Sequence, residues 1–200
     1  WGWYDQAVAT ATQQRVFNDY TLLYPRPFDR EVHSAAKLTS LEPELIYGLL
    51  RQESLYRADA MSGAGARGLL QLIPETARQT ARYWKRPRPS PDDLFDPRIN
   101  VPLGAGQLRM LVDRFGGQTP VALAGYNAGP NAAARWLPAA AIDSDIWIEN
   151  IPYNETRSYV QRVLWHSVVF AWLKSGEPQR TDAWVTRIAP PNAAAMVDAR

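Results

Sequence analysis

Residues 44–54 read Glu-Leu-Ile-Tyr-Gly-Leu-Leu-Arg-Gln-Glu-Ser, and their apolar side chains recur at the spacing of a helix. Ile46, Leu49 and Leu50 share one face, and the next position on that face, seven residues after Ile46, is Glu53. A carboxylate at the end of an apolar face is unfavourable unless it is neutral or has partners. The last turn of a helix also disfavours negative charge, so both effects raise the pKa of a carboxyl group there. We therefore expect Glu53 to be suited to general acid catalysis near neutral pH.

The helix by itself leaves a second interpretation open. The apolar face could end at Leu50 and leave Glu53 as a solvated residue in a fraying last turn, because buried carboxylates are uncommon. Three motifs further along the chain favour the catalytic interpretation. In order, they are Gly68-Leu69-Leu70-Gln71, Gly125-Tyr126-Asn127-Ala128-Gly129 and Glu155-Thr156-Arg157-Ser158-Tyr159-Val160.

Together with Glu53-Ser54, these motifs resemble the soluble lytic transglycosylases, lysozyme-like enzymes that cut the glycan strands of bacterial peptidoglycan. Each motif alone is weak, but four in this order and at these spacings are specific. The resemblance covers roughly residues 28–175. It implies a mainly α (α+β, lysozyme-like) catalytic domain with a small β or irregular Gly-rich region, acting in the periplasm.

The resemblance also assigns roles to single residues. Glu53 matches the catalytic acid and base, and Ser54 is expected to help orient that region. Gln71 matches a glutamine of the cleft that hydrogen-bonds sugar. At Leu70 the family commonly has methionine, a change that we expect to alter the shape of the cleft more than its chemistry.

Three further substrate-binding residues follow from the later motifs. Tyr126 matches a tyrosine whose hydroxyl points to the reacting centre, and Asn127 supports the same wall. Glu155 matches a residue that reaches the substrate or its stem peptide, but a carboxylate favoured by the dipole at a helix N-terminus explains it nearly as well. Arg157 and Tyr159 are expected to be structural.

Glycoside cleavage usually needs a second carboxylate as base or nucleophile. The candidates Asp59, Glu75, Asp92, Asp93 and Asp96 lie in no motif-like setting, so we expect them to be solvated surface residues. The resemblance explains why a second catalytic carboxylate is missing, because in lytic transglycosylases one glutamate acts first as acid and then as base. The N-acetyl group of the substrate assists, and the C6 hydroxyl of the muramyl sugar closes a 1,6-anhydro ring. A goose-type-lysozyme-like hydrolase and an inactive peptidoglycan-binding module are the alternatives. Intact Glu53, Gln71 and Tyr126 count against the second.

Composition excludes several other functions. The chain has 200 residues and no cysteine, which rules out thiol catalysis and thiolate ligands. His33 and His166 are too few and too far apart to indicate a metal site, and we expect no metal or cofactor. The net charge of +2 does not indicate nucleic acid, and the run Lys85-Arg86-Pro87-Arg88 is expected to be a solvated loop. No apolar stretch is long enough to cross a bilayer, and we expect a monomer.

We expect three parts along the chain. Residues 1–27 are predicted to be the end of an upstream α-superhelical domain with its linker, or else an ordinary N-terminal helix docked on the core. Residues 28–175 form the catalytic domain, and 176–200 a loosely packed tail. Because the chain begins with Trp1 rather than Met, we expect it to be a piece of a longer polypeptide. Helices are predicted near 3–20, 30–38, 43–54, 74–84, 101–115, from 120, and at 154–173, with Asp96-Pro97 and Asn100 as signals for a helix start.

Overall fold

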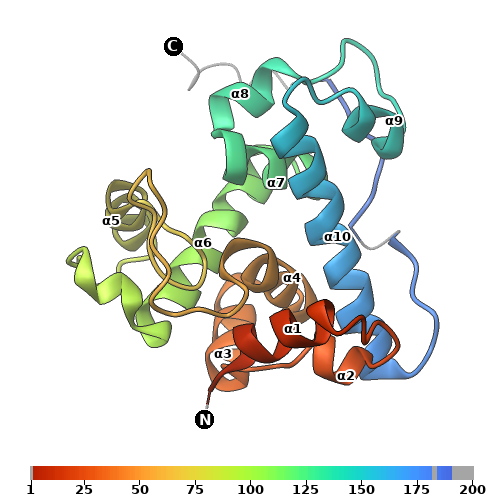
Figure 1. Ribbon diagram of the computed structural model, residues 1–200. Coiled ribbons are helices and arrows are strands. Elements are labelled where there is room, and N and C mark those ends of the chain that lie inside the picture. Colours follow the sequence, from red (N-terminus) through yellow and green to blue (C-terminus); the bar gives the residue numbers. More distant parts are fainter. Residues whose placement is uncertain (1, 182–183, 191–200) are drawn as a thin grey trace. The chain divides into compact units, whose positions relative to one another are not determined.

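The computed structural model describes residues 2–181 and 184–190, and it is almost entirely helical in these residues (Figure 1). Extended segments in this part of the chain pair only through isolated bridges, which join Met61 to Arg67, Arg67 to Leu72 and Ile142 to Ile188. The expected mainly α fold is therefore confirmed. The helices are α1 (Tyr4–Gln13), α2 (Tyr20–Leu23), α3 (Asp29–Thr39), α4 (Pro43–Ser54), α5 (Pro74–Tyr83), the 3₁₀ turn η1 (Asp92–Phe95), α6 (Pro97–Arg114), α7 (Thr119–Ala128), α8 (Pro130–Arg135), α9 (Ser144–Glu149) and α10 (Asn154–Ser175).

The described residues form two compact units, each with its own internal packing. Unit 1 contains the residues up to Gln107 together with His166–Gln179, and unit 2 contains Leu108–Trp165 with the residues from Arg180 on. Helices α6 and α10 each contribute residues to both units. These two units do not correspond to the three parts expected along the chain. They do not test whether residues 1–27 end an upstream domain, so the three-part organisation stays a prediction.

Helix α4 is the central element of unit 1. It begins at Pro43. A proline is tolerated at the first helical position because the backbone N–H there has no partner within the helix. The predicted apolar face is buried, but so are Leu45 and Tyr47, at 2% and 0% exposure. The Tyr47 ring packs on Phe170 of α10 at 5.1 Å, and its hydroxyl donates to a carboxylate oxygen of Asp29 in α3 at 3.0 Å. Neighbouring helices therefore cover α4 on nearly all sides.

The first turn of α4 carries a buried carboxylate, Glu44, which is 4% exposed. Its Oε1 lies 3.1 Å from the guanidinium of Arg26 and 3.1 Å from the ammonium of Lys174 at the end of α10. Burial alone would raise the pKa of Glu44, but the backbone hydrogen bond and these two cations outweigh it and hold the pKa below its usual value. The ion pair thereby links the start of α4 to the end of α10.

Unit 2 depends on close approach of its helices, as the Ala and Gly content of α7 predicts. A Cβ atom on Gly125 would lie 3.1 Å from the ring of Phe115 and 3.5 Å from Cα of Pro130, so a larger residue would push these segments apart. Ala122, Leu123 and Ala124 are fully buried beside it.

The prediction of a loosely packed tail is wrong for residues 184–190. Ile188 is completely buried and exchanges two backbone hydrogen bonds with Ile142, at 3.0 and 2.8 Å. The backbone N–H of Ala189 donates to the amide oxygen of Gln118 at 2.6 Å. This apolar anchor attaches the segment to the rest of unit 2. The Ala-rich end of the tail lies outside the described residues.

Three expectations about helices also need correction. The helix expected over 3–20 ends at Gln13, since Arg15 adopts a left-handed conformation (φ 57°), and α2 begins only at Tyr20. Helix α6 begins at Pro97, four residues before the expected start, and the six-residue helices α8 and α9 were not expected because such short segments show little periodicity. Among the described helices, none is both long and apolar enough to cross a membrane.

Candidate active site

Glu53 lies in the last turn of α4 and is partly exposed. That turn is ordered rather than frayed. Leu55 and Tyr56 adopt left-handed conformations (φ 49° and 68°), and the N–H of Leu55 donates to the carbonyl of Arg51 at 3.2 Å. The side chain of Glu53 is therefore presented from a fixed helix end, which differs from a fully solvated residue in a fraying turn.

The neighbours of Glu53 hold this helix end in unit 1. The hydroxyl of Ser54, which is 8% exposed, donates to the carbonyl of Leu50 at 3.3 Å. Tyr56 is 4% exposed, and burial raises the pKa of its hydroxyl even though the Arg51 charge opposes this. The guanidinium of Arg51 lies 4.3 Å from the ring centre of Tyr24, a favourable cation–π arrangement. The buried hydroxyl of Ser54 is thus satisfied within the helix, and its expected role toward substrate stays a prediction.

The Gly-rich segment after α4 folds into a tight, irregular loop, as expected for residues 56–73. The N–H of Gly68 donates to the carbonyl of Ala60 at 2.8 Å, and Gly68 itself has φ +72°. A Cβ atom at this position would collide with the carbonyl oxygen of Leu94 and with the Asn100 side chain. Glycine is therefore required here both by conformation and by space.

Asn100, which the sequence indicated only as a possible helix-start signal, fixes this loop instead. Asn100 belongs to α6, and its side chain is completely buried. Oδ1 accepts from the N–H of Leu70 at 2.7 Å, while Nδ2 donates to the carbonyls of Arg67 at 2.9 Å and Leu94 at 2.8 Å. The helix-start role belongs to Asp96, whose carboxylate accepts from the N–H of Arg98 at 2.9 Å.

The sequence carried no signal for this role of Asn100. A buried polar residue needs partners, but the burial of Asn100 is seen only in the structure. Two of its three partners, Leu70 and Arg67, lie 30 and 33 residues earlier in the chain, so no local pattern could identify them.

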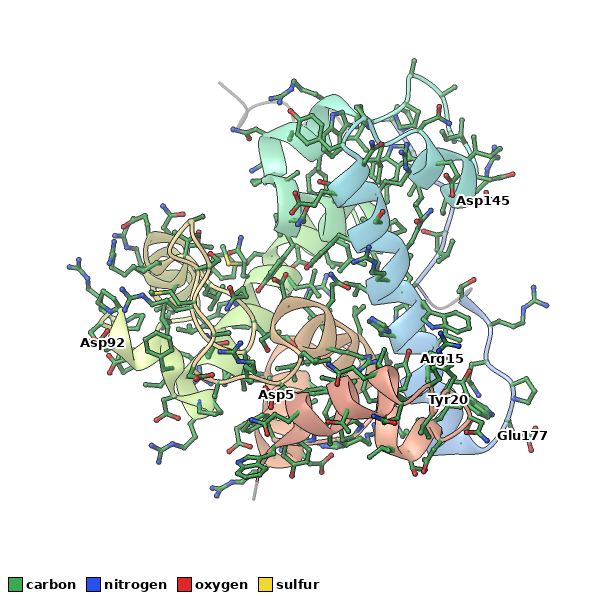
Figure 2. All side chains as sticks on the ribbon, viewed as in Figure 1. Asp5, Arg15, Tyr20, Asp92, Asp145 and Glu177 are labelled. Carbon is green, nitrogen blue, oxygen red and sulfur yellow. The ribbon has the colours of Figure 1, made fainter. Side chains whose placement is uncertain are left out.

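Gln71 follows directly in this loop and is partly exposed. Its backbone is left-handed (φ 44°), and its amide nitrogen donates to the carbonyls of Gly68 at 2.8 Å and Ala60 at 3.2 Å. Because both partners are carbonyl oxygens, they determine which end of the amide carries the nitrogen. Earlier in the loop, a surface ion pair of 2.7 Å between Arg67 and Asp92 ties it to η1 (Asp92 is labelled in Figure 2).

The other predicted residues lie in unit 2. Tyr126 and Asn127 are in the last turn of α7, and both are partly exposed. The amide oxygen of Asn127 accepts from the buried hydroxyl of Thr156 at 2.7 Å, which brings the end of α7 to the start of α10. Glu155 is exposed in the first turn of α10, a position that fits both interpretations given for it.

The structural roles expected for Arg157 and Tyr159 are confirmed. The guanidinium of Arg157 donates to the carbonyls of Glu149 at 3.1 Å and Ile151 at 3.3 Å, and it also contacts the Asn154 side chain. Tyr159 is 4% exposed. These contacts hold the segment that leads into α10.

The predicted residues are divided between the two units. Glu53, Ser54 and Gln71 belong to unit 1, while Tyr126, Asn127 and Glu155 belong to unit 2. Within the described residues, no cluster of three or more His, Asp or Glu side chains could hold a metal ion.

Comparison with known proteins identifies the family of this chain. The model of the Transglycosylase SLT domain matches residues 31–146, more than half of the chain. A putative soluble lytic murein transglycosylase of Haemophilus influenzae is 31% identical over 177 residues, 88% of this chain and 30% of the relative. The soluble lytic murein transglycosylase of Escherichia coli K12 is 28% identical over 179 residues, 88% of this chain and 28% of that protein.

Solved structures agree with these relatives. The lytic transglycosylase Slt of Pseudomonas aeruginosa, solved as an inactive mutant, superposes with a TM-score of 0.84 at 37% identity, covering 90% of this chain and 29% of that one. A complex of the 70 kDa soluble lytic transglycosylase with bulgecin A gives a TM-score of 0.86 at 27% identity over 93% of this chain and 31% of that one. The chain thus spans about three-tenths of the length of the proteins it matches. On the family model and these relatives together, the chain belongs to the Transglycosylase SLT domain family.

Proposed function

We propose that this chain is the catalytic part of a periplasmic lytic transglycosylase. Its substrate is the β-1,4 bond between N-acetylmuramic acid and N-acetylglucosamine in peptidoglycan, and its product is a 1,6-anhydromuramyl end. One observation carries the proposal: a partly exposed glutamate stands at the ordered end of a buried helix, beside a loop held by Asn100, in a chain of this family.

The reaction needs a single carboxyl group that transfers protons twice. Glu53 in its acid form donates a proton to the glycosidic oxygen while the bond from C1 to that oxygen breaks. The acetamido oxygen of the muramyl sugar assists at C1. The Glu53 carboxylate then takes the proton of the C6 hydroxyl as the C6 oxygen bonds to C1. Glu53 returns to its acid form, and no water is consumed.

The attacking hydroxyl belongs to the same sugar as C1, so the ring closure is intramolecular. Intramolecular attack gains effective molarity, which reduces the need for a second carboxylate to activate water. This agrees with the sequence, in which the one other motif carboxylate, Glu155, is matched to substrate binding and not to catalysis.

Other residues would hold the sugar in place. The Gln71 amide nitrogen is occupied by two loop carbonyls, which directs the amide oxygen to accept from a sugar hydroxyl or acetamido N–H. Asn127 is held by Thr156, so it can support the tyrosine before it, Tyr126, without moving. Glu155, exposed at the start of α10, would face the substrate or its stem peptide.

Glu53→Gln tests the catalytic assignment, since glutamine keeps the shape of glutamate but has no proton to transfer. We expect turnover to fall by at least about 100-fold with folding and peptidoglycan binding retained. Glu42→Gln is the matched control, because Glu42 is exposed at the other end of the same helix and should keep full activity. Near-normal turnover by Glu53→Gln would contradict the assignment.

The identity of the product tests the reaction itself. Fragments released in heavy-oxygen water should be lighter than hydrolytic fragments by one water and should carry no label at the new muramyl ends. Label at the muramyl C1, detected by mass spectrometry, would instead identify a lysozyme-like hydrolase. Binding of peptidoglycan without any released fragment would identify a binding module.

A further inference from the structure

Four arginines from two segments of unit 1 line one surface hollow, which we call the arginine groove. Arg78 and Arg82 come from α5, and Arg86 and Arg88 come from the segment that follows it. Glu75 completes the lining, and the cavity measures about 300 Å³. The five lining side chains together carry a net charge of +3, which exceeds the net charge of +2 of the whole chain.

Most of this charge is available to a ligand. Arg78 pairs with Glu75 through bonds of 3.0 and 2.5 Å, and this pairing, with help from Gln79 and Arg88, lowers the pKa of Glu75. The three other arginines are exposed, and in the part of the chain that the structure describes no carboxylate lies within ion-pair distance of them. Guanidinium groups present paired N–H donors that match the two oxygens of a carboxylate or the oxygens of a phosphate.

The backbone that carries the groove is fixed. The indole N–H of Trp84 donates to the carbonyl of Gly106 at 3.3 Å, and a Cβ atom on Gly106 would lie only 2.8 Å from that nitrogen. The N–H of Arg86 donates to the carbonyl of Ala81 at 2.8 Å, and the buried Pro89 restricts the chain further on. Arginines on a fixed backbone lose less conformational freedom on binding than arginines on a mobile loop.

A second hollow adjoins the first and extends it. It measures about 250 Å³ and shares Arg86 and Arg88 with the arginine groove. Pro87, Pro89, Ile99 and Leu103 give it apolar surface, and Arg98 and Asp93 add one charge of each sign. An elongated ligand that carries several anionic groups and short apolar side chains fits this combination better than a single ion does.

The position of the groove indicates where such a ligand would come from. Helix α5 begins three residues after Gln71 and has 10 residues, so its length of about 15 Å separates the proposed sugar-binding loop from the far end of the groove. An extended peptide of about four residues spans roughly 13 Å. A peptide attached to a sugar beside Gln71 is therefore long enough to reach Arg82, which lies about 12 Å along the helix from Pro74.

We propose that the arginine groove binds the carboxylate groups of the peptide stems carried by peptidoglycan, and so makes the protein prefer strands that bear peptides. This inference rests on the proposed function, because it takes peptidoglycan as the substrate. The run from Lys85 to Arg88 is then part of a binding surface rather than a solvated loop.

The test compares binding of glycan strands with and without their peptides. The groove variant is Arg82→Gln, Arg86→Gln and Arg88→Gln in one chain, made in the Glu53→Gln background so that the strands are not cut. Arg78 is kept because it pairs with Glu75. The control variant, Arg30→Gln, Arg135→Gln and Arg162→Gln, removes the same charge from three exposed arginines elsewhere.

We expect the groove variant to lower the ratio of affinities, peptide-bearing over peptide-free, by about 10-fold, since exposed ion pairs are individually weak and three are removed. The control variant should leave this ratio unchanged. The preference of the unmodified groove should also weaken as salt is raised. An unchanged ratio in the groove variant would overturn the proposal.

Two further outcomes separate this proposal from its rivals. Vesicles rich in anionic phospholipid that bind through the three arginines, with the peptide preference unchanged, would assign the groove to phosphate groups at a membrane and overturn the proposal. If the groove variant loses the peptide preference and the unmodified protein releases only hydrolytic products, the groove assignment stands and the proposed reaction is refuted.

Discussion

Replacement of Asn100 by alanine should destabilise the protein more than any surface substitution, because its side chain joins three segments. The change removes bonds to the Leu70 N–H and to the carbonyls of Arg67 and Leu94. The Arg67 carbonyl keeps a second bond from the N–H of Leu72 at 3.1 Å, so its loss is the smallest of the three. At about 1 kcal/mol for each buried bond, the free energy of unfolding should fall by about 3 kcal/mol.

For a chain of this size, a loss of that order lowers the melting temperature by roughly 6–12 °C. Circular dichroism or tryptophan fluorescence measures this shift directly. Asn131→Ala is the control, because Asn131 is exposed and makes a single 3.2 Å bond to Arg114. Its effect should stay within about 0.5 kcal/mol.

Asn100→Asp tests the direction of the hydrogen bonds. A carboxylate can still accept from the Leu70 N–H, but it cannot donate to the two carbonyls and would place a buried negative charge against them. The folded state then favours the protonated acid, so this variant should be at least as unstable as alanine at neutral pH and should recover on acidification. If either variant melts within about 2 °C of the wild type at neutral pH, the reasoning about this residue is wrong.

Other consequences are open to direct measurement. Gly68→Ala should destabilise the protein strongly, whereas Gly63→Ala in the same loop, where an added Cβ meets nothing within 4 Å, should leave the melting temperature unchanged; equal effects would show that the loop adapts freely. The pKa of Glu44 is lowered in the folded state, so its ion pairs contribute stability above the ordinary pKa near 4.5 that is lost as pH falls through the lower folded value. Glu44→Gln should flatten this acid dependence of the melting temperature, and an unchanged pH profile would argue against the ion pair. Gln71→Ala and Tyr126→Phe should lower turnover more than thermal stability, and a lower melting temperature with normal activity per folded molecule would make them core residues.

The sequence by itself determined the features that depend on near neighbours. The apolar spacing of residues 45–50 and the proline at position 43 predicted α4 with its correct bounds, and the position of Glu53 at its end followed from the same count. The order of the four motifs indicated the family that the comparisons show. Periodicity, helix termini and motif order are local properties of a chain, so they can be read without its fold.

Tertiary structure decided which polar groups meet. Asn100 looked like a helix start because its partners at Arg67 and Leu70 lie 33 and 30 residues away. The packing of residues 184–190 was missed for the same reason, because Ile188 pairs with Ile142, which is distant in the sequence. A buried polar or apolar group gains its stability from whichever segment covers it, and chain folding rather than neighbouring sequence chooses that segment.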